Sequence, residues 1–413
     1  FHDNEEINLQ LATCAFYMSN FYVTANLPQK AEDCYQELLM LADKFHGNEE
    51  INLQLANCAV NMSISYGTAN LLQKVEDCYL ELLKLVDKFP DNEEINLRLA
   101  SCAVNMSINY ENTNFQRKAE GCFLILQTLA DKFHDNEEIN LQLATCAFYI
   151  CNYYGTKNLP QKAEGCYLKL QTLADKFHDN EEINLALAKC AFNICNYYGT
   201  KNLPQKAEGC YLKLQTLAGT FPDNVEINLQ LASCAFNMSN YYAMKNLPEK
   251  AEGCYLELLK LAAKFPDNEE INLQLANCTF NMGVDYRTAN LSEKAEGCYL
   301  ELLKLAAKFP GNEEINLQLA SCAAYMCHLC NERPQKAAHI YNPLAGLCIA
   351  KLNDEYTNFL EPWMRGFVCI MRTPYYPHPE GTEQVQREFQ ALTELNGEKV
   401  FSLMRRYHGL EEE

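Results

Sequence analysis

Apolar residues recur along most of this chain at helical spacing, in segments separated by short polar breaks. In residues 136–154, Ile139, Leu143 and Ile150 fall on one side of a helix, because side chains four or seven positions apart share a helix face. Residues 160–177 show the same period. The predicted inner faces consist of Ile139, Leu143, Cys146, Ala147, Ile150 and Tyr154 in the first helix and of Ala163, Cys166, Tyr167, Leu170, Leu173 and Ala174 in the second. The pattern therefore predicts two successive amphipathic helices.

The ends of both predicted helices are marked by residues that suit them. Asp135, with Glu138 three positions later, predicts a capping box at the start of the first helix. Residues 155–158, Gly-Thr-Lys-Asn, interrupt the apolar period, and Pro160 suits the first turn of the second helix, where its missing N–H is tolerated. We therefore predict a helical hairpin in which each helix spans about 17 residues.

The hairpin is one copy of a unit that repeats every 44 residues. Each copy opens with a phenylalanine: Phe1, Phe45, Phe89, Phe133, Phe177, Phe221, Phe265 and Phe309. A single hairpin of this size cannot bury its apolar face alone, so the copies must stack on their neighbours. The sequence therefore predicts an all-α fold, an α-solenoid of eight repeats in which the last copy is degenerate.

Three short segments of the unit carry a family resemblance: Leu-Ala at 143–144, Lys-Ala-Glu-Gly-Cys-Tyr at 162–167, and Pro-Asp at 266–267 between two copies. In these segments the chain resembles the tetratricopeptide repeat (TPR) family, especially the long-repeat variant found in kinesin light chains. It departs from that family in its 44-residue unit, and Ile139 stands near the place of the family's large aromatic residue. The resemblance implies a right-handed α-solenoid of helix-turn-helix repeats over residues 1–340.

The repeat is lost in residues 341–413, which contain two further predicted helices separated by a proline-rich segment. Because the end of a solenoid exposes an apolar face, we predict that this region is a C-terminal helical cap. A functional C-terminal module is the alternative.

One face of the first helix varies between otherwise matching copies. The fourth and fifth copies, 133–176 and 177–220, differ at only five positions, and three of these lie at helical spacing i, i+3, i+7. The three pairs are Gln142/Ala186, Thr145/Lys189 and Tyr149/Asn193. We interpret the variable face as a recognition surface that was altered after duplication. The alternative is drift at exposed positions that packing does not hold.

We call the residues at these three positions of every copy the recognition stripe. Its members are Gln10, Thr13, Tyr17, Gln54, Asn57, Asn61, Arg98, Ser101, Asn105, Gln142, Thr145, Tyr149, Ala186, Lys189, Asn193, Gln230, Ser233, Asn237, Gln274, Asn277, Asn281, Gln318, Ser321 and Tyr325. Nearly all are neutral hydrogen-bonding groups, and Asn and Gln amides can pair with a peptide backbone whatever its side chains are. Tyrosine adds contact area at low entropic cost. The TPR resemblance implies that this face lines a concave groove holding a peptide or helix of a partner protein.

The overall charge and hydropathy narrow the classes of partner. The net charge is −20, whereas phosphate binding needs a basic face, so we expect no nucleic-acid partner. A basic or neutral protein partner is compatible with this charge, although acidic charge also simply keeps a long solenoid soluble. No apolar run is long enough to span a membrane, and we expect no membrane contact.

Fifteen of the 21 cysteines fall at two fixed positions of the repeat, beside alanines on the predicted packing faces. Buried free cysteine behaves as a small hydrophobic residue. We therefore predict free thiols and a reducing, cytoplasmic compartment rather than a disulfide framework.

Catalytic motifs are missing from the sequence, which has no Gly-rich phosphate loop, His-Glu-x-x-His or Gly-x-Ser-x-Gly segment. We therefore predict a protein that is not an enzyme and has no cofactor. Cys327 and Cys330 have the spacing of zinc ligands, but no second close pair accompanies them. We interpret them as ordinary helix packing and predict no metal site.

These features together predict a non-enzymatic protein–protein interaction scaffold. One alternative is the sensor portion of a larger immune-type or signalling receptor, since the chain starts without a methionine and near-identical copies with altered faces suit changing targets. Another is a regulatory or self-assembling structural subunit. The sequence leaves the partner and the oligomeric state open.

Overall fold

The computed structural model describes residues 4–112, 115–309 and 311–329 of the 413-residue chain, without the side chains of 111, 112, 320 and 323–329. Every regular element in this described part is an α-helix, and the helices alternate between two kinds. The A helices are α1 (Glu5–Thr24), α3 (Glu49–Thr68), α5 (Glu93–Asn112), α7 (Glu137–Thr156), α9 (Glu181–Thr200), α11 (Val225–Met244), α13 (Glu269–Thr288) and α15 (Glu313–Leu329). The B helices are α2 (Pro28–Lys44), α4 (Leu72–Lys88), α6 (Gln116–Lys132), α8 (Pro160–Lys176), α10 (Pro204–Thr220), α12 (Pro248–Lys264) and α14 (Ser292–Lys308).

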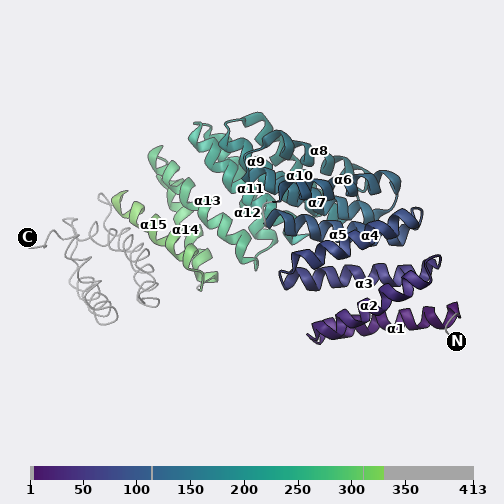
Figure 1. Cartoon of the computed structure of the whole chain (residues 1–413). Helices are drawn as coiled ribbons and strands as arrows, with labels where there is room; N and C mark the ends of the chain where they lie inside the picture. Colours follow the sequence, from purple (N-terminus) through teal and green to yellow (C-terminus); the bar gives the residue numbers. More distant parts are fainter. Residues whose placement is uncertain (1–3, 113–114, 310, 330–413) are drawn as a thin grey trace, which may run out of the picture. The chain divides into compact units, whose positions relative to one another are not determined.

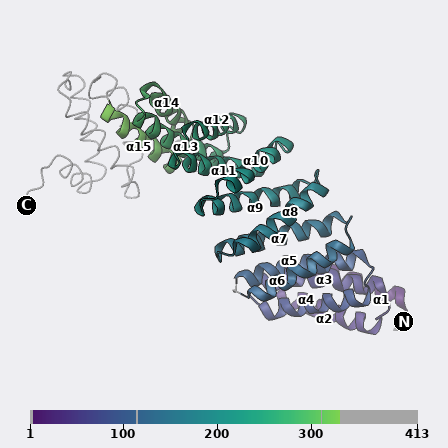
Figure 2. The same ribbon diagram turned by 90° about the horizontal axis from the view of Figure 1, so that it is seen from above.

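The chain divides into two compact units, Phe1–Phe221 and Pro222–Glu413. Within each unit an A helix contacts the next A helix, and a B helix contacts its own A helix and the following one. In the first unit the hairpins follow one another from α1–α2 to α9–α10 (Figures 1 and 2). Stacked helical hairpins confirm the predicted all-α solenoid. The predicted cap, residues 341–413, and the boundary at residue 340 lie outside the described residues.

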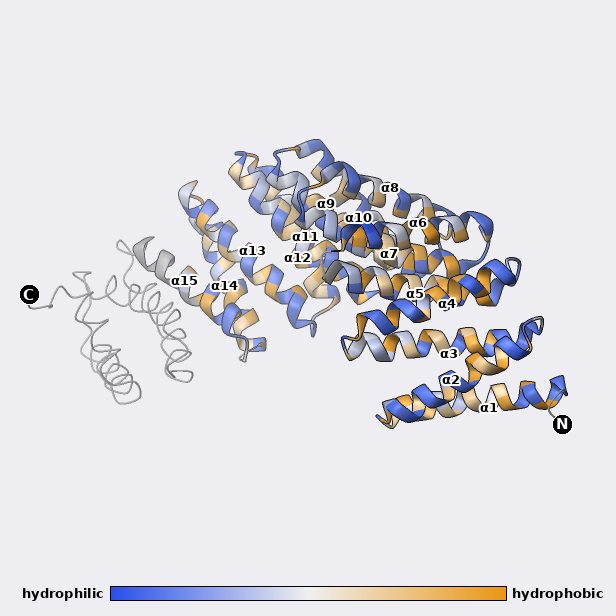
Figure 3. Ribbon diagram, in the orientation of Figure 1, coloured by the Kyte–Doolittle hydropathy of each residue, from blue (hydrophilic) through white to orange (hydrophobic). Residues whose placement is uncertain are grey.

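The apolar faces predicted for the fourth repeat form its core. Ile139, Leu143 and Ile150 of α7 are almost fully buried, and so are Ala163 and Leu170 of α8. The remaining predicted core residues, Cys146, Ala147, Tyr154, Cys166, Tyr167, Leu173 and Ala174, are buried as well. Figure 3 shows hydrophobic and hydrophilic residues sharing the described helices, as expected for helices that are buried on one side.

The predicted cap of helix α7 is wrong by one residue. The N-cap is Asn136, whose Oδ1 accepts a hydrogen bond from the Ile139 N–H at 2.8 Å. Asparagine adjoins the helix directly, so its short amide reaches the free N–H groups of the first turn. Asp135 lies one position too early, and its carboxylate instead pairs with Lys176 at 3.1 Å.

The A helices are also longer than predicted, with 20 residues in α7 against 17 in α8. Helix α7 continues through Gly155 and Thr156, which we had expected to interrupt it. The chain reverses at Asn158, whose φ of 58° lies in the left-handed region. Asparagine tolerates this region better than most residues, so the reversal falls there.

A buried asparagine in the first turn of the A helix donates hydrogen bonds to backbone carbonyls of the turn before it. In α9 the Asn184 Nδ2 group donates to the carbonyls of Phe177 at 3.2 Å, His178 at 3.2 Å and Asn180 at 2.8 Å. Asn184 is only 4% exposed. Its buried amide therefore bonds three carbonyls of the turn, and this holds the junction between consecutive hairpins.

A ladder of ion pairs joins consecutive B helices. A lysine near the start of each B helix pairs with a glutamate of the preceding one, at N–O distances of 2.5–2.8 Å. The pairs are Lys74–Glu32, Lys118–Glu76, Lys162–Glu120 and Lys206–Glu164 in the first unit and Lys294–Glu252 in the second. At Glu120 the Tyr154 hydroxyl donates a further bond at 2.9 Å. These groups link three helices of two repeats.

We expect Asn184→Ala to lower the free energy of unfolding by roughly 1–3 kcal/mol, because it removes three side-chain hydrogen bonds that tie the buried end of the turn to α9. Urea unfolding followed by circular dichroism measures the change. The matched control is Asn152→Ala on exposed surface of α7, which should stay within about 0.5 kcal/mol of the original protein. Equal effects of the two substitutions would contradict the junction role of Asn184.

We expect the Glu120 ladder contact to make stability sensitive to acid. The hydrogen bond from Lys162 holds the pKa of the Glu120 carboxyl below its ordinary value, with further bonds from Gln116 and Tyr154. A carboxyl whose pKa is lower in the folded chain stabilises the fold above its unfolded pKa, about 4.3, and this stability is lost as the pH falls through the folded pKa. Glu120→Gln should therefore destabilise the protein at pH 7 and flatten the decline in the urea midpoint below about pH 5. Exposed Glu138→Gln, outside the ladder, is the control; an unchanged acid decline in Glu120→Gln would refute the assignment.

Candidate partner-binding face

Most members of the recognition stripe are half-buried on the A helices. Gln10 and Tyr17 of α1 are exposed and Ala186 of α9 is buried. The half-buried members are Thr13, Gln54, Asn57, Asn61, Arg98, Ser101, Asn105, Gln142, Thr145, Tyr149, Lys189, Asn193, Gln230, Ser233, Asn237, Gln274, Asn277, Asn281, Gln318 and Ser321. The Tyr325 side chain is outside the described residues. The stripe therefore occupies the seam between consecutive A helices, partly open to solvent.

Several members of the stripe bond to the next repeat. The Arg98 Nε group donates to Asn57 Oδ1 at 2.5 Å, and Gln318 Nε2 donates to Asn277 Oδ1 at 2.8 Å. An Asn or Gln amide has two N–H donors and an oxygen with two lone pairs, so one such bond leaves further capacity for a ligand. The sequence did not predict these bonds, because they join positions in different repeats.

The stripe continues one turn further along the A helices than we predicted. Asn61 Nδ2 donates to Asn20 Oδ1 at 2.5 Å in the first unit, and Asn281 Nδ2 donates to Asn240 Oδ1 at 2.7 Å in the second. Asn20 and Asn240 follow the last predicted stripe position of their repeats by three residues, so they share its helix face. Helical periodicity could have identified this position. The comparison of the fourth and fifth copies could not, since both have asparagine there.

A pocket of about 300 Å³ opens between α7 and α9 at this extended part of the stripe. It is lined by Cys151, Asn152, Gly155 and Thr156 of α7 and by Asn193, Ile194, Asn196, Tyr197 and Thr200 of α9. Asn193 alone belongs to the predicted stripe. The Lys201 ammonium lies 5.7 Å from the centre of the Tyr197 ring, a cation–π arrangement beside the pocket. The pocket therefore offers amide, hydroxyl and aromatic groups. Such groups can hydrogen-bond and pack against a peptide.

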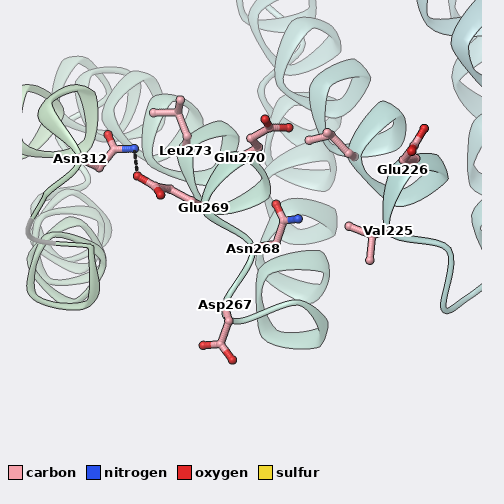
Figure 4. Close-up of a pocket in the computed structure, with 9 residues that line it drawn as sticks. Val225, Glu226, Asp267, Asn268, Glu269, Glu270, Leu273 and Asn312 are labelled. Atoms are coloured by element: carbon pink, nitrogen blue, oxygen red, sulfur yellow. Dashed lines mark hydrogen bonds between the residues drawn. The ribbon is translucent and has the colours of Figure 1, made fainter. Parts of the chain in front are cut away.

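A second hollow, of about 570 Å³, lies at the starts of α11 and α13 in the second unit (Figure 4). Glu226, Asp267, Glu269 and Glu270 contribute carboxylates to its lining. Glu269 accepts a hydrogen bond from Asn312 Nδ2 at 2.7 Å. The other lining residues are Val225, Leu229, Asn268, Leu273 and Asn312. The acidic residues at the starts of these two helices therefore line an acidic hollow.

No group of three or more His, Cys, Asp or Glu residues in the described part is placed to hold a metal ion. Cys330 and the Cys327 side chain lie outside that part. Burial raises the pKa of Cys58 to about 11 and that of Cys102 to about 12, so these thiols stay protonated near neutral pH. None of the described helices is both long and apolar enough to span a membrane.

The two repeat cysteine positions are buried, as predicted, from the second repeat onward. Cys146 and Cys190 are fully buried, whereas Cys14 of the first repeat is exposed and Cys34 half-buried. Helix α1 has no preceding hairpin among the described residues, which leaves this side of the first repeat open. The described cysteines are free thiols.

No protein-family model matches the chain, and no curated protein sequence matches it. Solved structures do resemble it. The apo form of RapI is 10% identical, with a TM-score of 0.42, and the match covers 91% of this chain and 99% of RapI. A tetratricopeptide repeat protein from Parabacteroides merdae is 12% identical, with a TM-score of 0.35 and coverage of 75% and 98%.

NprR, solved in complex with its cognate peptide NprX, is 14% identical to this chain, with a TM-score of 0.28 and coverage of 92% and 99%. Similarity at this level carries no statement about the ligand of the present chain. What the described residues do establish is the repeated hairpin, in which each A helix packs on its own B helix and on both helices of the preceding repeat within a unit. The described part of the chain is therefore an array of stacked helical hairpins.

Proposed function

We propose that this chain is a non-enzymatic scaffold that binds a peptide or helix of a partner protein along the recognition stripe. One observation carries the proposal: two neighbouring, nearly identical repeats differ at three half-buried or buried positions along one face of the A helix and match throughout the rest of the core. The Gln142/Ala186, Thr145/Lys189 and Tyr149/Asn193 pairs change the size, charge and hydrogen bonding of that side. None of the six residues contributes to the apolar core of its hairpin except Ala186, which is 9% exposed.

The geometry supports an elongated ligand. Stripe residues of successive A helices lie close enough to bond across the repeat boundary, as Arg98 does with Asn57. A chain laid across the A helices within one unit would therefore meet amide groups at every repeat. Such groups bind a peptide backbone through hydrogen bonds, and the pocket between α7 and α9 supplies a place for a side chain.

Drift at exposed positions is the competing interpretation of the variable stripe. Drift should affect the exposed surface of the B helices as well, yet residues 249–264 and 293–308 are identical in sequence. The stripe is also half-buried, so changes there meet more packing constraint than changes on the exposed B surface. Both points favour selection for binding.

The partner class and the compartment are further parts of the proposal. A net charge of −20 disfavours a nucleic-acid backbone as ligand and suits a neutral or basic protein. The free, buried cysteines agree with a reducing compartment, and we propose the cytoplasm.

We expect the triple substitution Tyr149→Ala, Lys189→Ala and Asn193→Ala to raise the Kd for the partner at least tenfold, because the three side chains lie on the proposed contact surface. A pull-down with quantitative mass spectrometry identifies the protein that the original chain enriches over the triple variant. Isothermal titration calorimetry with that protein then measures the Kd. The melting temperature should change by no more than about 2 °C, because the substituted side chains lie outside the apolar core.

The matched control places two substitutions on the B helices of the same repeats, Leu168→Ala and Leu212→Ala, at side chains that are each 55% exposed. This double variant should bind with unchanged Kd. If it loses binding while the triple variant keeps it, the partner contacts the B face and the proposal is wrong.

A further inference from the structure

Two buried thiols meet at the boundary between the fourth and fifth repeats. The sulfur atoms of Cys151 in α7 and Cys190 in α9 are 2.9 Å apart. Cys151 is 2% exposed and Cys190 is fully buried. A disulfide bond is about 2.05 Å long, so a small movement of either side chain would bring the sulfurs to bonding distance.

The contact arises from a change at a single repeat position. The first, second, third and sixth repeats have serine where the fourth has Cys151, namely Ser19, Ser63, Ser107 and Ser239. Ser19, Ser63 and Ser239 hydrogen-bond the thiol of the next repeat's cysteine, which is Cys58, Cys102 and Cys278 respectively. Stacking of the hairpins therefore brings these two positions together whichever residue occupies them. Cysteine at the serine position converts a hydroxyl–thiol contact into a thiol–thiol contact.

Cys151 keeps the orientation of the serine that it replaces. Its Sγ group donates to the Ala163 carbonyl at 3.5 Å, just as Ser19 Oγ donates to the Ala31 carbonyl at 3.3 Å. The Cys190 thiol comes from the repeat cysteine position that is buried in every described repeat after the first. Both sulfurs are therefore held in place by the ordinary packing of the array.

Cys151 is one of the residues that line the pocket of about 300 Å³ between α7 and α9, and Cys190 is not. We therefore expect a molecule the size of hydrogen peroxide that enters this pocket to meet Cys151 first. Contact with Cys151 and burial hold the pKa of Cys190 well above its ordinary value, which leaves Cys190 as the second thiol to react.

We propose that Cys151 and Cys190 form an oxidisable pair that hydrogen peroxide converts into a disulfide linking the fourth repeat to the fifth. Peroxide oxidises the Cys151 thiol to a sulfenic acid and releases one water. The Cys190 sulfur then attacks the Cys151 sulfur, the S–S bond forms, and the sulfenic oxygen leaves as a second water with the Cys190 proton. Two thiols lose two electrons in total, and one peroxide gains them.

The bond would link α7 covalently to α9, the two helices that line the pocket. It closes a loop between residues separated by 39 positions, and such a link restricts the unfolded chain. Most cytosolic disulfides are transient and redox-sensing, so a reversible link fits a reducing compartment.

The test uses the full chain treated with hydrogen peroxide under native conditions and digested without reductant. Mass spectrometry should find a peptide pair joined through Cys151 and Cys190, together with the loss of both of these free thiols. The melting temperature should rise by roughly 5 °C and return to its starting value after dithiothreitol. Cys151→Ser, which restores the residue of four other repeats, should abolish the joined peptide and the shift.

Cys195→Ser is the matched control, because it changes the same repeat position in the fifth repeat. This variant should still form the Cys151–Cys190 link. The proposal is overturned if peroxide leaves both thiols free, or if they disappear no faster than the other buried cysteines, or if Cys151→Ser shows the same rise in melting temperature.

Discussion

The packing of each A helix between two hairpins is the constraint on which this structure depends. Helix α7 contacts α5, α6, α8 and α9, so most of its circumference is covered. Close contact on so many sides requires small side chains, and Ala144, Cys146 and Ala147 are accordingly fully buried. Small residues therefore recur at these positions with the 44-residue period, alanine and cysteine in most repeats and Thr279 at the Ala147 position of the seventh.

This constraint also determines where the chain is free to diversify. When the core side, the B-facing side and the inter-repeat contacts of an A helix are occupied, a narrow solvent-open strip remains. We propose that the stripe lies there; its members are half-buried, and Arg98 bonds to Asn57 of the neighbouring repeat. A ligand at this strip would use the hydrogen-bonding capacity that such bonds leave, so each contact would add modest affinity. Binding strength would then come from the number of repeats that one ligand spans.

The sequence alone was sufficient for the repeat, the two helices and their buried faces, because periodicity determines which side of a helix is apolar. It was insufficient for details that depend on geometry. The cap at Asn136 and the reversal at Asn158 differ from the prediction by a residue or two, because neighbouring residues at each helix end could also cap or end the helix. Contacts such as Asn61–Asn20 depend on how hairpins stack, which the spacing of apolar residues does not specify. The sequence was enough to propose the stripe residues, but it gave no indication of the pocket beside them.

The cysteines show how one stacking geometry yields two kinds of chemistry. At Cys102 the thiol is a small apolar group whose pKa burial raises. A second sulfur placed opposite it, as Cys151 is opposite Cys190, changes the outcome without altering the fold. The same two A helices carry the three variable stripe pairs. A covalent link between them would act on the relative position of the very side chains by which the two repeats differ, so recognition and redox state would be coupled through one helix–helix contact.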